Sequence, residues 1–289
     1  MAYEIITDSS SNLSKSMIKE IGVRVLSLSF FVGSEEYKGY REDEEFDYAS
    51  FYAKLRSKEN VKTSLVNADI FIEEFEKILE DGKDVLAILM SSGISGTYQA
   101  AKIAADTVRE RYSDRQVIVI DSLSASIGQG LLVYYAAKLR ETGKTVEEAA
   151  DWVYKNRLKM VHQFTVDDLF FLKRGGRLSG GVAIIGTILQ VKPVMHMDNN
   201  GLLVVQDKVN GRKKSLNAMF EIFKKNVKDP QNQVIAICHG DCLKDAEYLA
   251  DKIRTETEVK DIIINFCDPV IGAHSGPGTL ALFYMGEER

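Results

Sequence analysis

The segment VLAILM-SSGISG-TYQAAKIAADTVRER, which runs from Val85 to Arg111, decides the fold class. Its first six residues form an apolar run of strand length, and apolar residues recur at helical spacing from Thr97 onward. Six residues, mostly serine and glycine, join the two parts. A buried strand that leads through a short loop into a helix predicts an α/β protein with a mainly parallel sheet.

The rest of the first half repeats this alternation. Tyr3–Thr7 and Val117–Ile120 are further apolar strands. The expected helices are Leu13–Ile21, Ile70–Leu79, Thr97–Arg111 and Ser126–Arg140. We therefore expect an N-terminal domain, residues 1–158, with a mainly parallel sheet flanked by helices.

The second half has a different pattern. The strands Val191–Met197 and Leu202–Val209 flank the turn sequence Asp198-Asn199-Asn200-Gly201, which predicts a hairpin. Further strands and helices alternate with this hairpin. The expected C-terminal domain, residues 159–289, is α+β with a mixed or antiparallel sheet, and the boundary falls near Asn156–Met160.

Composition excludes several classes of protein. The net charge of -5 argues against nucleic acid as the main partner, and no RNP, helix-turn-helix or zinc-finger signature is present. No apolar stretch approaches the ~18 residues of a membrane span, and the N-terminus lacks the pattern of a signal peptide. Three cysteines, an odd number, suit a reducing compartment. We expect a cytoplasmic protein without a membrane span.

Three strands end in hydroxyl-rich loops, which begin at Asp8, Ser91 and Asp121. The carboxyl ends of parallel strands lie at one edge of a sheet, so these loops should meet in one crevice. Each loop precedes a helix, whose unpaired N–H groups favour an anion. The alternative is ordinary helix capping, which we expect for Ser10, Ser11, Ser124 and Ser126.

The loops favour an anion with a single charge. They contain no Lys or Arg, and no Lys follows Gly96 as a phosphate-binding P-loop would require. A polyphosphate without a cation clamp would be unusual, whereas hydroxyl and N–H groups alone can hold a carboxylate.

Ser95 is also a candidate nucleophile, but its surroundings do not fit the usual pattern. A G-x-S-x-G elbow requires glycine at position 97, where this chain has Thr97. The candidate base is His274, in the glycine-rich segment Gly272–Gly278, which we expect to be a turn that closes the site. The other three histidines lie in or beside expected strands and are interpreted as structural.

Two basic clusters and one cysteine pair complete the candidates. Lys173–Arg177 predicts either a capped last helical turn or a cationic rim beside the ligand, and Arg212–Lys214 predicts a partner surface. Cys238 and Cys242 lack a second cysteine pair, so we expect no metal site. The acidic segment Glu35–Asp47 is expected to be a solvated loop.

Seven motifs in order along the whole chain resemble the DegV family, which includes the fatty acid-binding subunits of bacterial fatty acid kinase. They are TDS at Thr7, TS at Thr63, SSGISGTYQ at Ser91, DS at Asp121, LKRGGR at Leu172, RKK at Arg212 and GAHSGPG at Gly272.

The resemblance implies a lipid-binding protein of phospholipid metabolism that is not itself an enzyme and needs no cofactor. Such a protein holds a long-chain fatty acid between its two domains and presents the carboxylate to a separate ATP-dependent kinase, which forms the acyl phosphate. The implied carboxylate-binding residues are Thr63, Ser64, Ser95, Gly96, Arg174 and His274. Arg212 and Lys213 are implied as the docking site for the kinase, although Gly211 departs from the family pattern. The expected lining of the acyl pocket includes Phe30, Phe170, Phe171 and Ile271, with ordinary core packing as the alternative for the same residues. Transient membrane contact is also expected.

Two alternatives remain open. One is a serine hydrolase or acyltransferase that uses Ser95 and His274 on fatty acyl esters, and the other is a binding protein for a different carboxylate. Ser95→Ala separates the first alternative from a carrier, because a hydrolase would lose all turnover and a carrier would lose only affinity.

Overall fold

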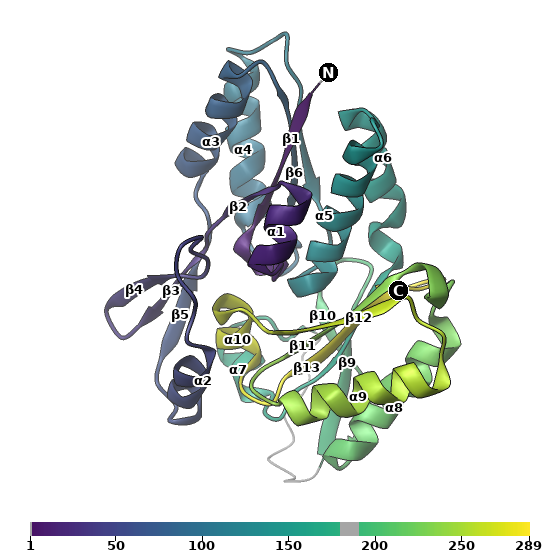
Figure 1. Ribbon diagram of the computed structural model, residues 1–289. Coiled ribbons are helices and arrows are strands. Elements are labelled where there is room, and N and C mark those ends of the chain that lie inside the picture. The colour runs from purple at the N-terminus through teal and green to yellow at the C-terminus, as the bar shows by residue number, and fades with distance from the viewer. Residues whose placement is uncertain (1, 180–190) are drawn as a thin grey trace.

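The computed structural model describes residues 2–179 and 191–289. Within these ranges the strands form a four-stranded, a six-stranded and a three-stranded sheet (Figure 1). None of the helices in the same ranges combines the length and the apolar character needed to cross a lipid bilayer.

The four-stranded sheet is parallel, in the order β2-β1-β6-β7. Successive side chains of a strand point to opposite faces, so Leu86 and Ile88 pack on one face and Val85 and Ala87 on the other. The strands are β1 (Tyr3–Asp8), β2 (Arg24–Leu26), β6 (Asp84–Leu89) and β7 (Val117–Asp121). One face is covered by α1 (Lys15–Ile21), α5 (Ser126–Glu141) and α6 (Val146–Asn156), and the other by α3 (Ala68–Glu80) and α4 (Thr97–Arg109) (Figure 1). The predicted α/β fold of this half is confirmed.

The six-stranded sheet is mixed, in the order β10-β9-β8-β13-β11-β12, and β11 and β12 form its parallel pair. The strands are β8 (Met160–Thr165), β9 (Val191–Met197), β10 (Leu203–Asn210), β11 (Val234–His239), β12 (Asp261–Phe266) and β13 (Leu280–Met285). Helices α8 (Arg212–Asn226) and α9 (Leu243–Glu256) pack on its outer face (Figure 1). The predicted hairpin joins β9 and β10. The predicted division at residue 158 falls between α6 and β8, within the short 3-10 helix Arg157–Lys159.

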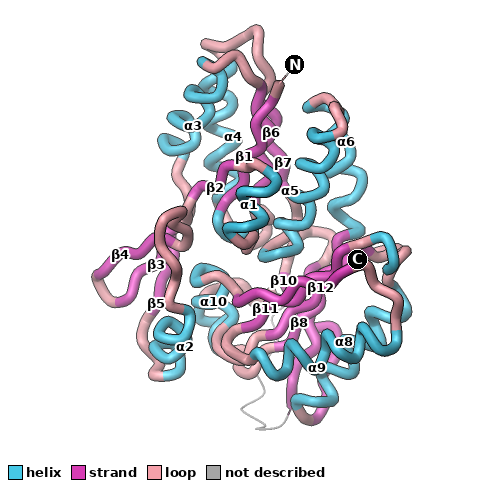
Figure 2. The backbone as a smooth tube through the Cα atoms, in the orientation of Figure 1, coloured by secondary structure: helices cyan, strands magenta, loops and turns pink. Residues whose placement is uncertain are grey.

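Helix α5 lies between the two large sheets (Figure 2). Its first eight residues are all buried, as expected for a helix that is covered on every side. A Cβ on Gly128 would collide with His162 of the six-stranded sheet, and a Cβ on Gly130 would collide with the Ser11 carbonyl oxygen. Glycine at these positions therefore allows the helix to approach both of its neighbours.

The three-stranded sheet contains β3 (Ser29–Val32), β4 (Glu35–Lys38) and β5 (Val61–Ser64), and α2 (Tyr48–Arg56) packs beside it (Figure 2). The interpretation of Glu35–Asp47 as a loop is therefore wrong for its first four residues. Tyr37 stacks on Phe30 with the ring centroids 5.2 Å apart, and this contact between paired strands stabilises the hairpin. The same sheet places Thr63 and Ser64 in a strand.

The expected turn Gly272–Gly278 is helical over its first four residues, which include His274, and is a turn only at Pro277 and Gly278. Helix α10 (Pro269–Ser275) begins at Asp268, whose Oδ1 accepts hydrogen bonds from the amides of Val270 at 2.6 Å and Ile271 at 2.9 Å. Pro269 occupies the first helical position, where its missing N–H costs no hydrogen bond. The helix ends at Gly276, whose φ of 81° requires glycine. His274 therefore projects from the last turn of a capped helix.

Candidate functional site

The three hydroxyl-rich loops lie side by side at the carboxyl edge of the parallel sheet, but the loop that begins at Asp8 contributes no residue to the cavity wall. The Asp8 carboxylate accepts a hydrogen bond from the Met90 amide at 3.0 Å, and the Asp121 carboxylate accepts one from the Ser92 amide at 3.1 Å. Asp8 is fully buried, and this burial raises its pKa. These two carboxylates hold neighbouring loops together.

A cavity of about 330 Å³ opens beyond this edge, between the loops, α10 and the inner face of the six-stranded sheet. Its wall is polar at one end and mostly apolar elsewhere. The polar end contains Thr63, Ser64, Ser95, Arg177 and His274, with the backbone of Gly96. The wall elsewhere also includes Ser126, His162, Cys238, Cys267, Ser275 and Thr279. The apolar lining includes Leu28, Leu65, Met90, Ile94, Ala125, Phe164, Leu172, Met197, Leu203, Val270, Ile271, Ala281 and Phe283.

The polar end brings together residues that are far apart in the sequence. The Thr63 hydroxyl on β5 lies 2.8 Å from Nε2 of His274 on α10. Ser95 precedes α4, where its hydroxyl lies 2.9 Å from the Thr97 hydroxyl and accepts a hydrogen bond from the Thr97 amide. Gly96 is the N-cap of α4 and has no side chain, so among the described residues Ser95 alone accepts a side-chain hydrogen bond from a first-turn amide of this helix. The positive end of a 13-residue helix therefore adjoins the cavity.

Gly175 sets the position of the His274 ring. A Cβ at residue 175 would collide with Nδ1 of His274, so only glycine lets the end of α7 (Phe170–Arg174) pack against this ring. Nδ1 is buried and has no hydrogen-bond partner among the described residues. Burial, then the charge of Arg177, then the charge of Arg174 lower the pKa of His274 to about 4. The imidazole is therefore neutral at pH 7.

Protonation of His274 should destabilise the unliganded protein in acid. Its pKa is about 4 in the folded state and about 6.5 in an unfolded chain, so its contribution is complete above pH 6.5 and is lost as the pH falls toward 4. We expect about 2–3 kcal/mol of the wild-type unfolding free energy to disappear between pH 7 and pH 4.5 through this group. Urea titrations at both pH values give the loss of unfolding free energy for the wild type and for His274→Asn. The difference between the two losses is the contribution of His274, because the other titrating groups are common to both proteins. Equal losses in the two proteins would contradict the prediction.

Arg177 lies at the polar end of the cavity but is not among the carboxylate-binding residues expected from the sequence. It lines the cavity, donates from Nε to the Ile94 carbonyl oxygen at 3.0 Å and also donates to the Gly175 carbonyl oxygen. Partial burial lowers its pKa, and no carboxylate of the described residues forms an ion pair with it. The signal was present in the basic segment Lys173–Arg177, which predicts a cationic rim.

Arg174 has a different environment. Its guanidinium lies over the rings of Phe171 and Phe170, 5.1 and 5.8 Å from their centroids, and one of its terminal nitrogens is buried without a partner among the described residues. Arg174 is not one of the residues that line the cavity, although its charge acts on His274. The cation that faces the cavity is Arg177.

Three of the four expected acyl-pocket residues lie outside the cavity. Phe30 packs in an aromatic cluster with Tyr37, Phe46 and Phe51, Phe170 is 53% exposed, and Phe171 packs against Ala273 and Gly276. Only Ile271 of the four lines the wall. We therefore assign the apolar wall to the residues of the cavity named above.

The floor of the cavity is β13 with its two neighbouring strands. Ala281 pairs with Phe164 of β8 and with Cys238 of β11, and Phe283 pairs with His162. Thr279, which precedes β13, bonds to the Ser275 carbonyl oxygen at 2.9 Å and so lies at the His274 end. Because alternate residues of a strand share a face, the floor runs from Thr279 through Ala281 to Phe283.

His162 and Phe283 close the far end of the cavity. Their rings meet edge to face at 5.2 Å. Nε2 of His162 accepts a hydrogen bond from the Ala125 amide at 3.1 Å, and Nδ1 lies 2.9 Å from the Met160 carbonyl oxygen. Burial lowers the pKa of His162 well below its usual value, so this end carries no charge.

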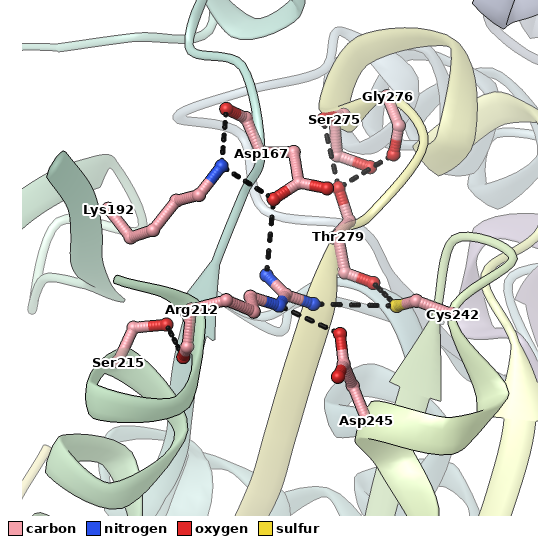
Figure 3. Close-up of polar contacts among 9 residues, drawn as sticks. All are labelled: Asp167, Lys192, Arg212, Ser215, Cys242, Asp245, Ser275, Gly276 and Thr279. Carbon is pink, nitrogen blue, oxygen red and sulfur yellow. Dashed lines mark hydrogen bonds and ion pairs between the residues drawn. The ribbon is translucent and has the colours of Figure 1, made fainter. Parts of the chain in front are cut away.

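Arg212 and Lys213 lie at the start of α8. Nε of Arg212 donates to Asp245 at 2.8 Å, its Nη1 lies 3.9 Å from Asp167, and its Nη2 lies 3.5 Å from Cys242 Sγ (Figure 3). Lys213 lies over the ring of Tyr248. The Arg212 charge is thus largely matched by acidic neighbours, and a role of either residue in docking a partner stays a prediction.

Comparison with known proteins supports one family over the whole chain. The family model described as "Uncharacterised protein, DegV family" matches residues 2–287. A DegV domain-containing protein of Clostridium perfringens is 42% identical over 99% of this chain and 98% of its own length. A DegV domain-containing protein of Lactococcus lactis is 33% identical over 100% of this chain and 99% of its own.

Solved structures agree with this assignment. A DegV family protein from Thermus thermophilus, described by its fatty acid binding, superimposes with a TM-score of 0.89 at 27% identity over 98% of this chain and 99% of its own. DegV from Bacillus subtilis, described as a fatty acid binding protein, gives a TM-score of 0.83 at 28% identity over 98% of both chains. The protein whose cavity is described above belongs to the DegV family.

Proposed function

We propose that this protein binds a long-chain fatty acid, with the carboxylate at the polar end of the cavity and the acyl chain along its apolar floor. The observation that carries the proposal is the asymmetry of the wall, which is polar and cationic at one end and mostly apolar elsewhere. The relatives from Thermus thermophilus and Bacillus subtilis, which bind fatty acids, have the same fold.

The polar end suits a single carboxylate. In the proposed complex Arg177 supplies the charge, and the Thr63 and Ser95 hydroxyls and the N-terminus of α4 supply further donors. Ser64 and Gly96 lie beside them. Neutral His274 either donates a hydrogen bond or takes up a proton when the anion approaches, because an opposite charge raises the pKa of an imidazole.

The acyl chain supplies most of the affinity. Burial of ~14–16 methylenes at about 0.8 kcal/mol each is worth roughly 11–13 kcal/mol before the costs of ordering are subtracted. The polar end therefore needs only moderate strength to fix the orientation of the ligand.

The finer proposal is that the protein presents the carboxylate to a separate kinase in the cytoplasm. Leu65 and Ser64, which line the polar end, are both exposed, so this end adjoins the protein surface. Arg212 and Lys213 are the proposed contacts with the partner. A titration of a fatty acid kinase catalytic subunit with wild type and with Lys213→Glu tests this part, and equal binding of the two proteins would contradict it.

The geometry favours a carrier over a hydrolase. The Ser95 hydroxyl contacts Thr97, and the nearest hydroxyl to Nε2 of His274 is that of Thr63. No acidic side chain among the described residues hydrogen-bonds to Nδ1 of His274. Serine hydrolysis requires a nucleophile that contacts a base and an acid that orients the base. The described residues do not form this arrangement around Ser95 and His274.

Denaturation of the purified protein and mass spectrometry of the organic extract test the proposed function. We expect a long-chain fatty acid in about equimolar amount from protein produced in lipid-replete cells. Absence of such an acid, together with no uptake of added octadecanoic acid by delipidated protein, would contradict the proposal.

Ser95→Ala should weaken octadecanoic acid binding about tenfold, because it removes one hydrogen bond to a charged group. A displacement titration with a fluorescent fatty acid measures this change. Hydrolysis of a fatty acyl ester should be assayed with the same two proteins. Turnover by the wild type that Ser95→Ala abolishes would favour the hydrolase instead.

A further inference from the structure

The Ser126 hydroxyl lies in the cavity and does not cap a helix. Ser126 is the first residue of α5, Ala125 is the N-cap, and no side chain caps this helix. The capping role expected for Ser126 is therefore wrong. Its side chain is 4% exposed and contributes to the cavity wall, and its hydroxyl contacts only Cys238 Sγ, at 3.4 Å, among the described residues.

The backbone of Ser126 is strained, and its hydroxyl has only a weak hydrogen-bonding partner. Ser126 has a φ of 54°, in the left-handed region that residues with a Cβ rarely adopt. A thiol is a weak hydrogen-bonding partner, so the buried hydroxyl is poorly satisfied. Cys238 pairs with Ala281 in the middle of the cavity floor, so its neighbour Ser126 lies beside the proposed acyl chain. Ser126 is therefore nearer the middle of the cavity than the far end, which His162 and Phe283 close.

A second buried hydroxyl in the same wall is also unsatisfied. Ser275 is 6% exposed, and its Oγ has no hydrogen-bond partner among the described residues. Ile271 and Ser275 are four residues apart on α10, so they share one face of the helix, and both line the cavity. Ser275 lies next to Thr279 and therefore nearer the carboxylate end than Ser126.

We propose that the cavity selects long-chain acids that carry a hydroxyl or oxo group on the alkyl chain, and that Ser126 binds this group. The proposal rests on the proposed fatty acid binding and narrows its ligand class. An unsubstituted chain would leave the Ser126 and Ser275 hydroxyls buried without adequate partners, whereas a substituent on the chain can accept from Ser126 or donate to it. Ser275 offers a second hydrogen bond to a substituent closer to the carboxylate.

The test compares octadecanoic acid with hydroxyoctadecanoic acids substituted at successive carbons, by displacement titration on delipidated protein. We expect one group of neighbouring isomers to bind about three- to tenfold more tightly than octadecanoic acid, as one added neutral hydrogen bond allows. Ser126→Gly should remove this preference. Glycine tolerates positive φ, so the variant should unfold at the same temperature as the wild type or higher.

Two controls separate hydrogen bonding from other effects. Ser124 lies in the same loop, but its buried hydroxyl accepts a hydrogen bond from Arg289 and does not line the cavity. The preference for a hydroxy acid should therefore persist in Ser124→Ala. Cis-9-octadecenoic acid bends without offering a hydroxyl, and its affinity relative to octadecanoic acid should not respond to Ser126→Gly.

Three outcomes would overturn the proposal. The first is the absence of any preferred hydroxy isomer in the wild type, and the second is a preference that survives in Ser126→Gly, whether or not Ser275→Ala removes it. The third is a change in the affinity for the cis acid on Ser126→Gly as large as the change for the preferred hydroxy isomer. If octadecanoic acid itself fails to bind, the proposed function fails as well, so the affinity for the unsubstituted acid distinguishes the two failures.

Discussion

Ala281→Phe should abolish fatty acid binding and leave the fold intact. Ala281 is the middle residue of the cavity floor, between Phe164 and Cys238, and its Cβ faces the space that the acyl chain would occupy. A phenyl ring there would block passage toward Phe283 and exclude about half of the methylenes. At about 0.8 kcal/mol for each buried methylene, this loss corresponds to a decrease in affinity of about a thousandfold or more.

The same substitution should change stability little. A large side chain in a packed core typically costs about 1–3 kcal/mol, but here the ring enters a cavity of about 330 Å³. Phenylalanine is preferred to tryptophan because it adds no N–H group that needs a partner. Isothermal titration with octadecanoic acid and thermal unfolding measure the two effects, and Ala281→Ser is the matched control with nearly unchanged volume. A folded Ala281→Phe protein with wild-type affinity would place the acyl chain elsewhere.

The parallel half of the fold was predictable because its evidence is local. The segment Val85–Arg111 contains a strand, a loop and a helix within one short stretch, and the strand edge at which the loops meet follows from the general geometry of parallel sheets. The hairpin at Asp198–Gly201 was equally local. The strand Glu35–Lys38 was missed because a polar, charged segment becomes a strand only through its pairing with Phe30 and its neighbours, which composition does not reveal.

The residues that line the cavity were less predictable, because strand pairing and the alternation of side chains along each strand determine which of them face the cavity. Phe30, Phe170 and Phe171, expected in the acyl pocket, do not line the cavity. Phe164 and Phe283 face it because they lie opposite Ala281 and His162 in paired strands. Sequence alone gives neither this register nor the face of the sheet that α5 leaves open.

His274 and Ser126 illustrate two errors about where helices begin. Gly272–Gly278 looked like a turn because of its glycines, but Asp268 and Pro269 just before it form a helix start. Ser126 looked like a helix cap because serine favours that position. In the structure Ala125 is the N-cap, and Ser126 has a positive φ and a hydroxyl 3.4 Å from Cys238 Sγ.

Arg177→Met should reduce the affinity for octadecanoic acid by about a hundredfold. The resemblance to the family implies Arg174 as the cation at the carboxylate, whereas Arg177 is the arginine that lines the cavity. Hydrogen bonds to charged groups are worth about 1.5–3 kcal/mol, and partial burial keeps this charge from being fully screened. Methionine retains an unbranched apolar side chain and removes the charge and the donors. Isothermal titration at low and moderate salt measures the loss.

Arg174→Met is the matched control that separates the two arginines. Both charges lower the pKa of His274, so either substitution should raise that pKa, and NMR titration of the ring detects the change in both variants. Only Arg177→Met should also cause the large loss of affinity, because Arg174 lies over Phe171 and Phe170 and not along the cavity wall. Arg177→Lys, which keeps the charge without the planar fork, should bind with intermediate affinity. A larger loss in Arg174→Met than in Arg177→Met would place the carboxylate beside α7 and make Arg174 its partner.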